Sequence, residues 1–190
     1  MGTKVGSDGW IEAGWLALIE RGVSGVKVEA LARKLGVTKG SFYHHFKNRA
    51  ELLDEMLERW VRMGTELAIE VADQRQRPDE RFISLIETIF TPTPFDGVEV
   101  AIRSWAATDE AVARVVSLVD ERRLSYVRGI LEERGFSAQR SRARAEILYR
   151  VVIGDFMWRS IGGRELDAIE RAELSSCLLY TSDAADERSW

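Results

Sequence analysis

The 190-residue chain has little of what would mark several other protein classes. Its single cysteine, Cys177, excludes a disulfide framework within the chain and a multi-cysteine zinc site. With only three prolines, and apolar residues recurring every three or four positions, the sequence predicts an all-α fold. No apolar run approaches the roughly 20 residues of a membrane helix, since the longest candidate, residues 147–158, contains Arg150 and Asp155. No secretory signal follows Lys4, so we expect a cytoplasmic protein without a membrane partner.

Signatures of catalysis and of cofactor binding are also missing. The sequence has no serine-centred nucleophile motif, no phosphate-cradling glycine loop and no dinucleotide fingerprint. The two histidines, His44 and His45, are adjacent and therefore about 100° apart on a helix, which prevents them from facing one metal ion together. The acidic pair Glu132-Glu133 is typical of a solvated helix face. We therefore expect no enzyme activity, no cofactor and no metal site.

The charges that are present are distributed unevenly. The net charge is −4, yet residues 27–49 contain six basic residues against one acid, Glu29, so the rest of the chain carries −9. A basic segment on an acidic protein predicts a contact face for nucleic acid.

Residues 28–46, VEALARKLGVTKGSFYHHF, lie within this basic segment and predict two short helices. Gly36 ends the first, because the chain turns sharply there and glycine takes a positive φ without strain. Thr38 starts the second helix, in which Phe42 and Phe46 are spaced to face inward.

The second of these helices has the residue types that a DNA-reading helix needs. A helix in the major groove must be narrow at its tip, and Lys39, Gly40 and Ser41 form a small, polar first turn. Helix N-termini attract phosphate through free amides and the helix dipole. The alternative is that the aromatic residues and histidines only cover a small core, but the clustering of basic and aromatic residues favours DNA. The residues expected from this pattern at the DNA are Thr38, Lys39, Gly40, Ser41, Tyr43, His44 and Lys47.

Residues 28–57, VEALARKLGVTKGSFYHHFKNRAELLDEML, strongly resemble the DNA-binding domain of the TetR (tetracycline-repressor-like) regulators. The resemblance covers roughly residues 9–60. It implies a three-helix helix-turn-helix head, a homodimer, a palindromic double-stranded DNA operator and a ligand pocket in a helical body, with repression as the commoner mode. In the family, the positions matching Thr38, Lys39, Ser41, Tyr43, His44 and Lys47 contact DNA, mostly at phosphates. Where this chain has Lys27 the family usually has threonine, so that phosphate contact passes to an ammonium group or is lost.

We therefore predict a DNA-binding domain over residues 1–50 and a helical effector-binding and dimerisation domain over residues 51–176. The first helix is expected to start at Ser7 or Asp8 and to end at Gly22. Later helices are expected to start at Asn48, Pro78, Asp96, Thr108, Ser137 and near Glu165. The helix over residues 137–162 and the one after it are the candidate dimer faces.

The second half has no motif that identifies a ligand. An aromatic lining would suit an apolar or aromatic small molecule, and Arg103 is either an anchor for an anionic group or solvated. For any single apolar residue, a plain core role is favoured over pocket lining. The candidate pocket residues are Phe82, Ile86, Phe90, Arg103, Trp105, Tyr126, Tyr149 and Met157.

Two alternatives complete the predictions. The segment CLLYTSDAADE, residues 177–187, resembles a translated sequencing-adapter sequence, so residues 177–190 are predicted to be non-native rather than an ordinary polar tail.

In place of a DNA-binding regulator, the chain could be a helical protein-interaction adaptor. Salt separates these two functions, because binding that neutralises phosphates weakens steeply with salt.

Overall fold

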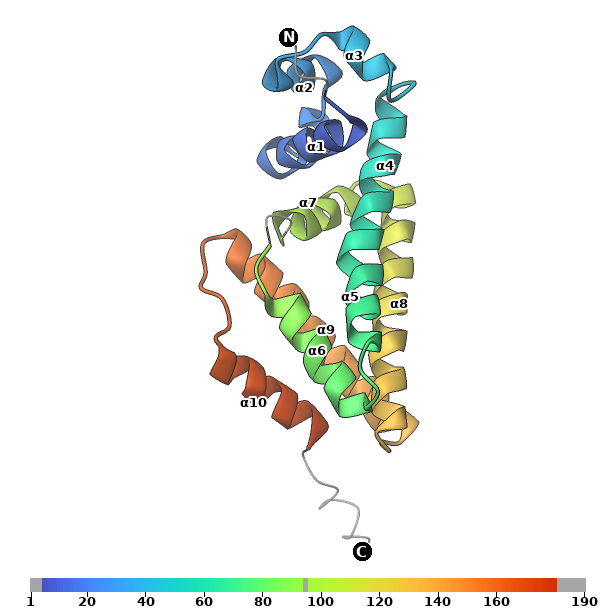
Figure 1. Cartoon of the computed structure of the whole chain (residues 1–190), viewed down its shortest axis with the longest axis vertical. Coiled ribbons are helices and arrows are strands. Elements are labelled where there is room, and N and C mark those ends of the chain that lie inside the picture. The colour runs from blue at the N-terminus through green and yellow to red at the C-terminus, as the bar shows by residue number, and fades with distance from the viewer. Residues whose placement is uncertain (1–4, 94–95, 181–190) are drawn as a thin grey trace, which may run out of the picture. The chain divides into compact units, whose positions relative to one another are not determined.

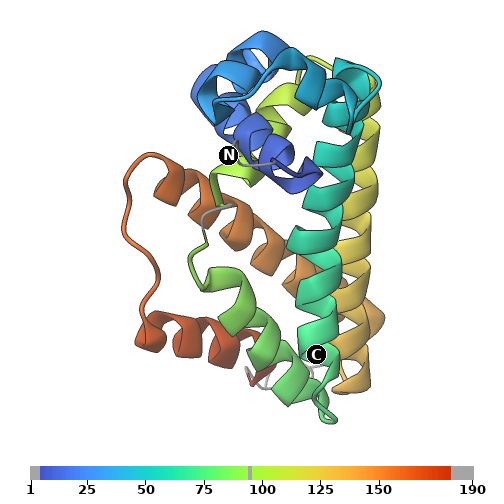
Figure 2. The same cartoon turned by 45° about the horizontal axis from the view of Figure 1, so that its top comes forward.

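A computed structural model describes residues 5–93 and 96–180 of the chain (Figure 1, Figure 2). Over these residues every regular element is a helix and none is a strand, so the predicted all-α class is confirmed. The helices form two compact units, Met1–Glu66 with Pro94–Val119 and Leu67–Thr93 with Asp120–Trp190. Within the described ranges, no helix is both long and apolar enough to cross a membrane. The predicted functional division near residue 50 stays a prediction.

The first unit contains the N-terminal head together with elements from the middle of the chain. Its elements are α1 (Ser7–Arg21), the short 3₁₀ helix η1 (Val23–Gly25), α2 (Val28–Leu35), α3 (Lys39–Tyr43), α4 (Arg49–Val61), α7 (Asp96–Ala106) and the beginning of α8 (Glu110–Glu133). Helix α1 packs against α2, α4 and α7, and α2 packs against α3. Helix α7 therefore packs against the N-terminal head as part of the same unit.

Two glycines end α1 and α2 as predicted. Gly22 has φ 65° and Gly36 has φ 67°, a region that strains any residue with a Cβ. After Gly36, the amide of Val37 donates to the carbonyl of Ala32 at 3.0 Å, which closes the last turn of α2. The angle between α2 and α3 therefore depends on a glycine at position 36.

The caps of the head helices are partly as predicted. Asn48 caps α4, and its side chain accepts from the amide of Glu51 at 3.0 Å. Helix α1 begins at Ser7 as expected, but its N-cap is Gly6, without a side-chain cap. Asp8 lies within the first turn of α1 rather than at its N-cap, and its carboxylate accepts from Arg59 of α4 at 2.5 Å.

Two later helices start slightly beyond the predicted positions. Helix α8 begins at Glu110 rather than Thr108, because the Asp109 carboxylate accepts from the first free amides. Helix α10 (Ala168–Leu179) begins after Glu165, where Asp167 and Glu170 form a capping box. In both cases a carboxylate nearer the helix is the stronger start signal.

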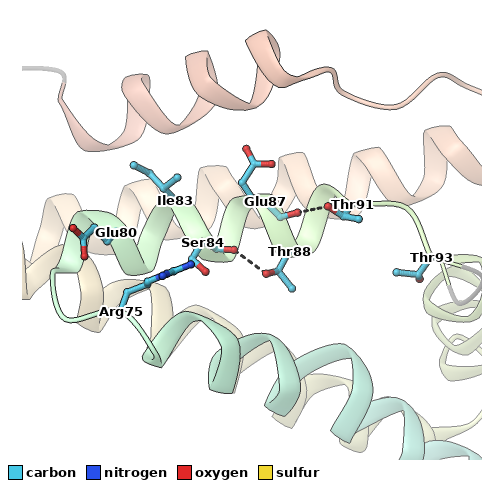
Figure 3. A pocket seen from close by; sticks show the side chains of 8 residues that line it. All are labelled: Arg75, Glu80, Ile83, Ser84, Glu87, Thr88, Thr91 and Thr93. Carbon is cyan, nitrogen blue, oxygen red and sulfur yellow. Dashed lines mark hydrogen bonds between the residues drawn. The ribbon is translucent and has the colours of Figure 1, made fainter.

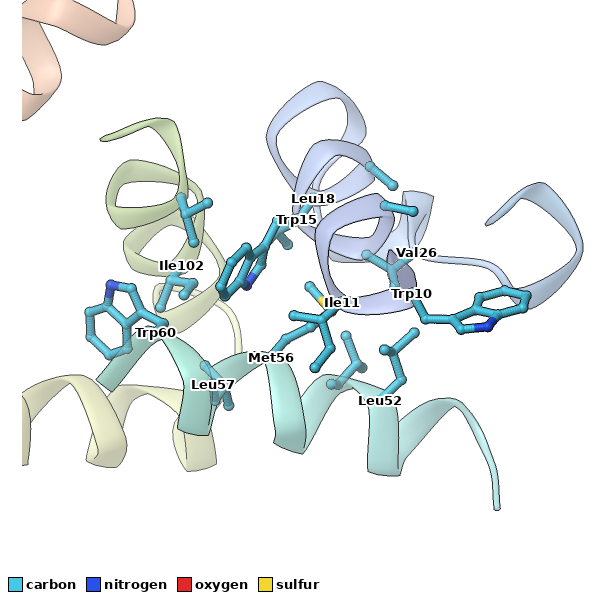
Figure 4. Packing of buried hydrophobic residues seen from close by; sticks show 14 of the residues in the cluster. Trp10, Ile11, Trp15, Leu18, Val26, Leu52, Met56, Leu57, Trp60 and Ile102 are labelled. Carbon is cyan, nitrogen blue, oxygen red and sulfur yellow. The ribbon is translucent and has the colours of Figure 1, made fainter. Parts of the chain in front are cut away.

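The core of the first unit is dominated by large side chains (Figure 4). Trp10 of α1 and Phe42 of α3 are fully buried, with ring centroids 5.2 Å apart in an edge-to-face arrangement. Leu52 and Met56 of α4 and Ile102 of α7 are also closed from solvent. Burial of this much apolar surface is the main stabilising contribution to the unit.

The second unit consists of helices from the remaining parts of the chain. Its elements are α5 (Leu67–Asp73), α6 (Pro78–Phe90), the rest of α8, α9 (Ala138–Ser160) and α10. Helix α6 packs against α5 and α10. The helical path from α4 to α5 is interrupted by a π-helical turn, η2 (Arg62–Glu66), and the two units divide at its end.

The last described helix contains the first residues of the segment predicted to be non-native. Leu178 and Leu179 of α10 are buried in the core of the second unit. Arg144 of α9 donates to the carbonyl of Leu178 at 2.6 Å and to that of Cys177 at 3.1 Å. The origin of residues 177–190 stays a prediction, and residues 181–190 lie outside the described part of the chain.

Candidate nucleic-acid interface

Helices α2 and α3 follow one another with the turn at Gly36 between them (Figure 1), and their residues form a two-sided element, buried on one side and exposed on the other. Leu31, Phe42 and Phe46 are buried on its inner side. Helix α3 has only five residues and would not be helical alone, because helix nucleation is costly. Packing of Phe42 against Trp10 therefore positions the residues on the other side of α3.

The residues predicted at the DNA lie on the solvent side of this element. The exposed members are Lys27, Thr38, Lys39, Gly40, Tyr43, His44 and Lys47, and Ser41 is half-buried. The Tyr43 side chain is largely in solvent although its ring contacts Phe42 edge-to-face at 5.3 Å. Thr38 is the N-cap of α3 and makes no side-chain capping bond. The predicted ammonium, hydroxyl and imidazole groups are thus accessible to solvent at or near α2 and α3, and their DNA contacts stay a prediction.

The two adjacent histidines have different environments. His44 is exposed, whereas His45 is half-buried and its Nε2 lies 2.9 Å from the carbonyl oxygen of Val5, a geometry in which the ring donates. His45 therefore attaches the chain before α1 to the end of α3. Among the described residues, no group of three or more histidine, cysteine or acidic side chains is arranged to hold a metal ion.

Arg49, one of the six basic residues of the segment, has an internal role. Its Nε donates to the carbonyl of Val26 at 2.5 Å, and its Nη2 donates to the carbonyl of Val23. These bonds fix the start of α4 to the connection between α1 and α2. A guanidinium group has several donors and can therefore bond to both carbonyls at once.

Three of the exposed lysines of the head pair with carboxylates. Lys39 Nζ lies 2.5 Å from Glu29 Oε1, Lys34 lies 3.3 Å from Glu20, and Lys47 lies 3.9 Å from Glu51. The Lys39 ammonium is the main cause that holds the pKa of Glu29 below its usual value. Sequence reasoning did not find the pairing of Glu29 with Lys39, because the two residues belong to different helices.

The predicted pocket residues are divided between the two units. Phe82, Ile86 and Phe90 are closed inside the second core, and Met157 is half exposed. Tyr126 donates to Asp73 at 2.6 Å, while Tyr149 donates to Asp120. In the first unit, Trp105 donates to Asp109, and Arg103 donates to Glu99 at 2.7 Å. Their role in ligand binding stays a prediction.

The second unit has an open groove of about 800 Å³ along α6 (Figure 3). It is lined by Arg75, Glu80, Ile83, Ser84, Glu87, Thr88, Thr91 and Thr93, none of which was predicted. Thr88 and Thr91 each donate to the carbonyl four residues earlier, at 2.8 and 2.6 Å, so their oxygens remain able to accept. The sequence feature that indicates this groove is a row of hydroxyl and charged side chains at helical spacing, on the side of α6 opposite its apolar stripe.

Residues 11–56 match the sequence model of the family described as bacterial regulatory proteins, tetR family. An uncharacterised HTH-type transcriptional regulator of Bacillus subtilis, YwcC, is 34% identical over 80 residues, which is 42% of this chain and 35% of that protein. The HTH-type transcriptional repressor KstR2 of Mycobacterium tuberculosis is 29% identical over 108 residues, which is 57% of this chain and 50% of the repressor. The chain thus spans half or less of the length of these relatives.

A solved structure extends the likeness to nearly the whole fold. The transcriptional regulator FadR of Bacillus subtilis, solved in complex with stearoyl-CoA, has a TM-score of 0.67 at 16% identity, covering 91% of this chain and 97% of FadR. At this identity the match establishes the fold only. The two-sided element of α2 and α3 lies within the residues 11–56 that match the family model.

Proposed function

We infer that this chain, which belongs to the tetR family of bacterial regulatory proteins, regulates transcription by binding double-stranded DNA and releases it when a small-molecule effector binds. The observation that carries the proposal is the two-sided α2–α3 element. Its apolar side is buried, and its other side presents Lys39, Tyr43, His44 and Lys47 to solvent. Such a face suits the major groove and its flanking phosphates.

Most of these groups would position the protein rather than read bases. Phosphate contacts, which carry no sequence information, are assigned to Lys27, Thr38, Tyr43 and Lys47. Base reading is assigned to Lys39, Ser41 and His44, which lie on the small first turns of α3 and just after it.

We assign dimerisation to helix α9. Ile147, Trp158 and Ile161 occur at helical spacing along one side of α9 and its end, and each exposes more than half of its side chain. Gly154 is on the same side and has open space around it. An apolar row of this kind suits a second copy of the same helix. In a dimer of this type, the two α3 helices would enter successive major grooves about 34–36 Å apart.

The effector is assigned to the helical body, and its apolar or aromatic character rests on the predicted lining. FadR, which shares the fold, was solved with stearoyl-CoA, and this supports a small-molecule ligand here. An effector weakens DNA binding when it favours a state in which the two heads no longer match the operator. Repression is the mode that the resemblance favours.

Replacing Lys39 with alanine is expected to weaken binding to duplex DNA about 3- to 10-fold and to reduce the slope of log K against log salt by about 0.9, because one positive charge that offsets phosphate charge is lost. Fluorescence anisotropy with a labelled duplex at several salt concentrations measures both quantities. Unchanged affinity at low and moderate salt would count against the DNA-binding assignment. Salt-independent binding to a protein partner would favour the adaptor function instead.

Replacing Ile147 with glutamate is expected to convert the protein to a monomer, because it places a charge within the proposed α9 contact. Light scattering at micromolar concentration should give about the 21.5 kDa chain mass for this variant and twice that mass for the unmodified protein. Val71→Glu on α5 is the matched control, since Val71 is also partly exposed but lies on another helix. A dimer that persists in Ile147→Glu contradicts the assignment to α9.

A further inference from the structure

Residues 27–49 contain six basic residues and a single acidic residue, Glu29. It lies in the first turn of α2, and its side chain is 58% exposed. Its Oε1 is 2.5 Å from Nζ of Lys39, the first residue of α3. The carboxylate therefore stands at the junction of the two helices, beside an ammonium assigned to DNA.

The Glu29 carboxylate stays ionised near neutral pH. Lys39, and more weakly Lys27, hold the pKa of Glu29 below its usual value, so that the carboxylate remains charged well below pH 7. Nζ of Lys39 has three donors and lies 2.5 Å from the Glu29 carboxylate, so a DNA phosphate must share Lys39 with this carboxylate or replace it. The carboxylate left behind would then face a polyanion.

We propose that Glu29 is a specificity-determining residue of the DNA-binding face, which holds Lys39 in the free protein and penalises sequence-independent binding. The proposal rests on the DNA-binding function proposed above. Non-specific affinity comes mainly from neutralised phosphates, so a carboxylate on the contact face lowers it directly. The penalty is relieved where a base edge offers an amino donor to the carboxylate, as cytosine N4 does in the major groove.

A purely structural role predicts the opposite sign. An acid in the first turn of a helix interacts favourably with the helix dipole, and its pairing with Lys39 could simply brace α2 against α3. Removal of Glu29 would then loosen the element and weaken DNA binding. An exposed pair contributes little to stability, so the direction of the change in affinity decides between the two roles.

The test compares the full chain with its Glu29→Gln variant on a labelled duplex of mixed sequence, between about 50 and 200 mM salt. The variant is expected to bind about 3- to 10-fold more tightly, with a salt slope steeper by about 0.9, because Lys39 meets phosphate without giving up a partner. Thermal unfolding verifies that both proteins are folded. Equal or weaker binding by Glu29→Gln overturns the proposal.

Glu20→Gln is the matched control. It makes the same change in net charge and breaks the Lys34–Glu20 pair, which is about as exposed but joins α1 to α2. Its affinity is expected to stay within about 2-fold of the unmodified protein, because the lost charge lies off the proposed contact face and is screened by salt. An equal gain in both variants would show that only net charge matters, and would overturn the proposal.

Two further measurements separate the parts of the proposal. In a Lys39→Ala background, the part of the gain that comes from releasing Lys39 is lost, so the gain from Glu29→Gln should be smaller than in the unmodified protein, whereas an equal or larger gain would overturn the role of the ion pair. On duplexes enriched by the unmodified protein from a random-sequence pool, Glu29→Gln should lower the ratio of enriched to mixed-sequence affinity at least about 3-fold. An unchanged ratio overturns the specificity role. If the unmodified protein binds no duplex at low salt, the DNA-binding function itself fails, a result distinct from all of these.

Discussion

Replacing Phe42 with alanine is expected to lower the free energy of unfolding by about 3–5 kcal/mol and to abolish DNA binding. Phe42 is fully buried, with Trp10 at 5.2 Å on one side and Phe46 at 5.3 Å on another. Removing the ring leaves a cavity beneath α3. This helix has only five residues and is not stable without its packing contacts. Urea unfolding followed by tryptophan fluorescence measures the loss, since Trp10, Trp15, Trp60 and Trp105 are all buried in the core of this unit.

Tyr43→Ala is the control, because Tyr43 is the next residue of the same helix but is 61% exposed. Its truncation removes only an edge contact to Phe42, so a loss of stability of about 1 kcal/mol or less is expected. DNA affinity should still fall several-fold, because the hydroxyl assigned to phosphate is gone. Equal stability losses for the two variants would contradict the two-sided description of α3.

The head was predictable because its boundaries are set by local chemistry. Gly36 must end α2, since a positive φ favours glycine, and Asn48 can start α4 because its side chain reaches the amide of Glu51. The inward spacing of Phe42 and Phe46 likewise needs only the helical period. Each signal involves residues within four positions of one another.

The contacts that organise the site were not predictable from spacing. His45 bonds to a carbonyl 40 positions earlier, and Arg49 bonds to carbonyls 23 and 26 positions earlier. In the sequence, Arg49 counts as one more basic residue of a basic segment, and Glu29 as an exception to it. Only the folded arrangement gives the first a structural role and places the second beside Lys39.

Pocket residues present a different difficulty. Phe82, Ile86 and Phe90 recur at the helical period whether they fill a core or line a cavity, so the pattern alone supports both roles. The groove along α6 is instead lined largely by polar residues, which sequence reasoning treats as a solvated face. Burial, rather than residue type, separates these cases.

Helix α7 illustrates how a single buried group joins distant segments within one unit. Glu99 of α7 is 5% exposed, and its Oε2 accepts from the indole nitrogen of Trp60 in α4 at 2.8 Å. Its Oε1 accepts from Nε of Arg103 at 2.7 Å. A buried carboxylate is tolerated when charge-assisted hydrogen bonds compensate its desolvation. Glu99 therefore links the helix that follows the DNA-binding element to a helix nearly 40 residues later.

Replacing Glu99 with alanine is expected to lower the free energy of unfolding by about 2–4 kcal/mol, because it removes both hydrogen bonds and the charge that balances Arg103. Glu99→Gln should cost less, since an amide oxygen still accepts from Trp60. Glu146→Ala on α9 is the matched control, because Glu146 pairs with Arg142 and Arg150 at the surface, where such pairs contribute about 1 kcal/mol or less. Urea unfolding with tryptophan fluorescence compares the three variants. If Glu99→Ala lowers the free energy of unfolding no more than Glu146→Ala does, the buried hydrogen bonds of Glu99 do not stabilise the packing of α4 against α7.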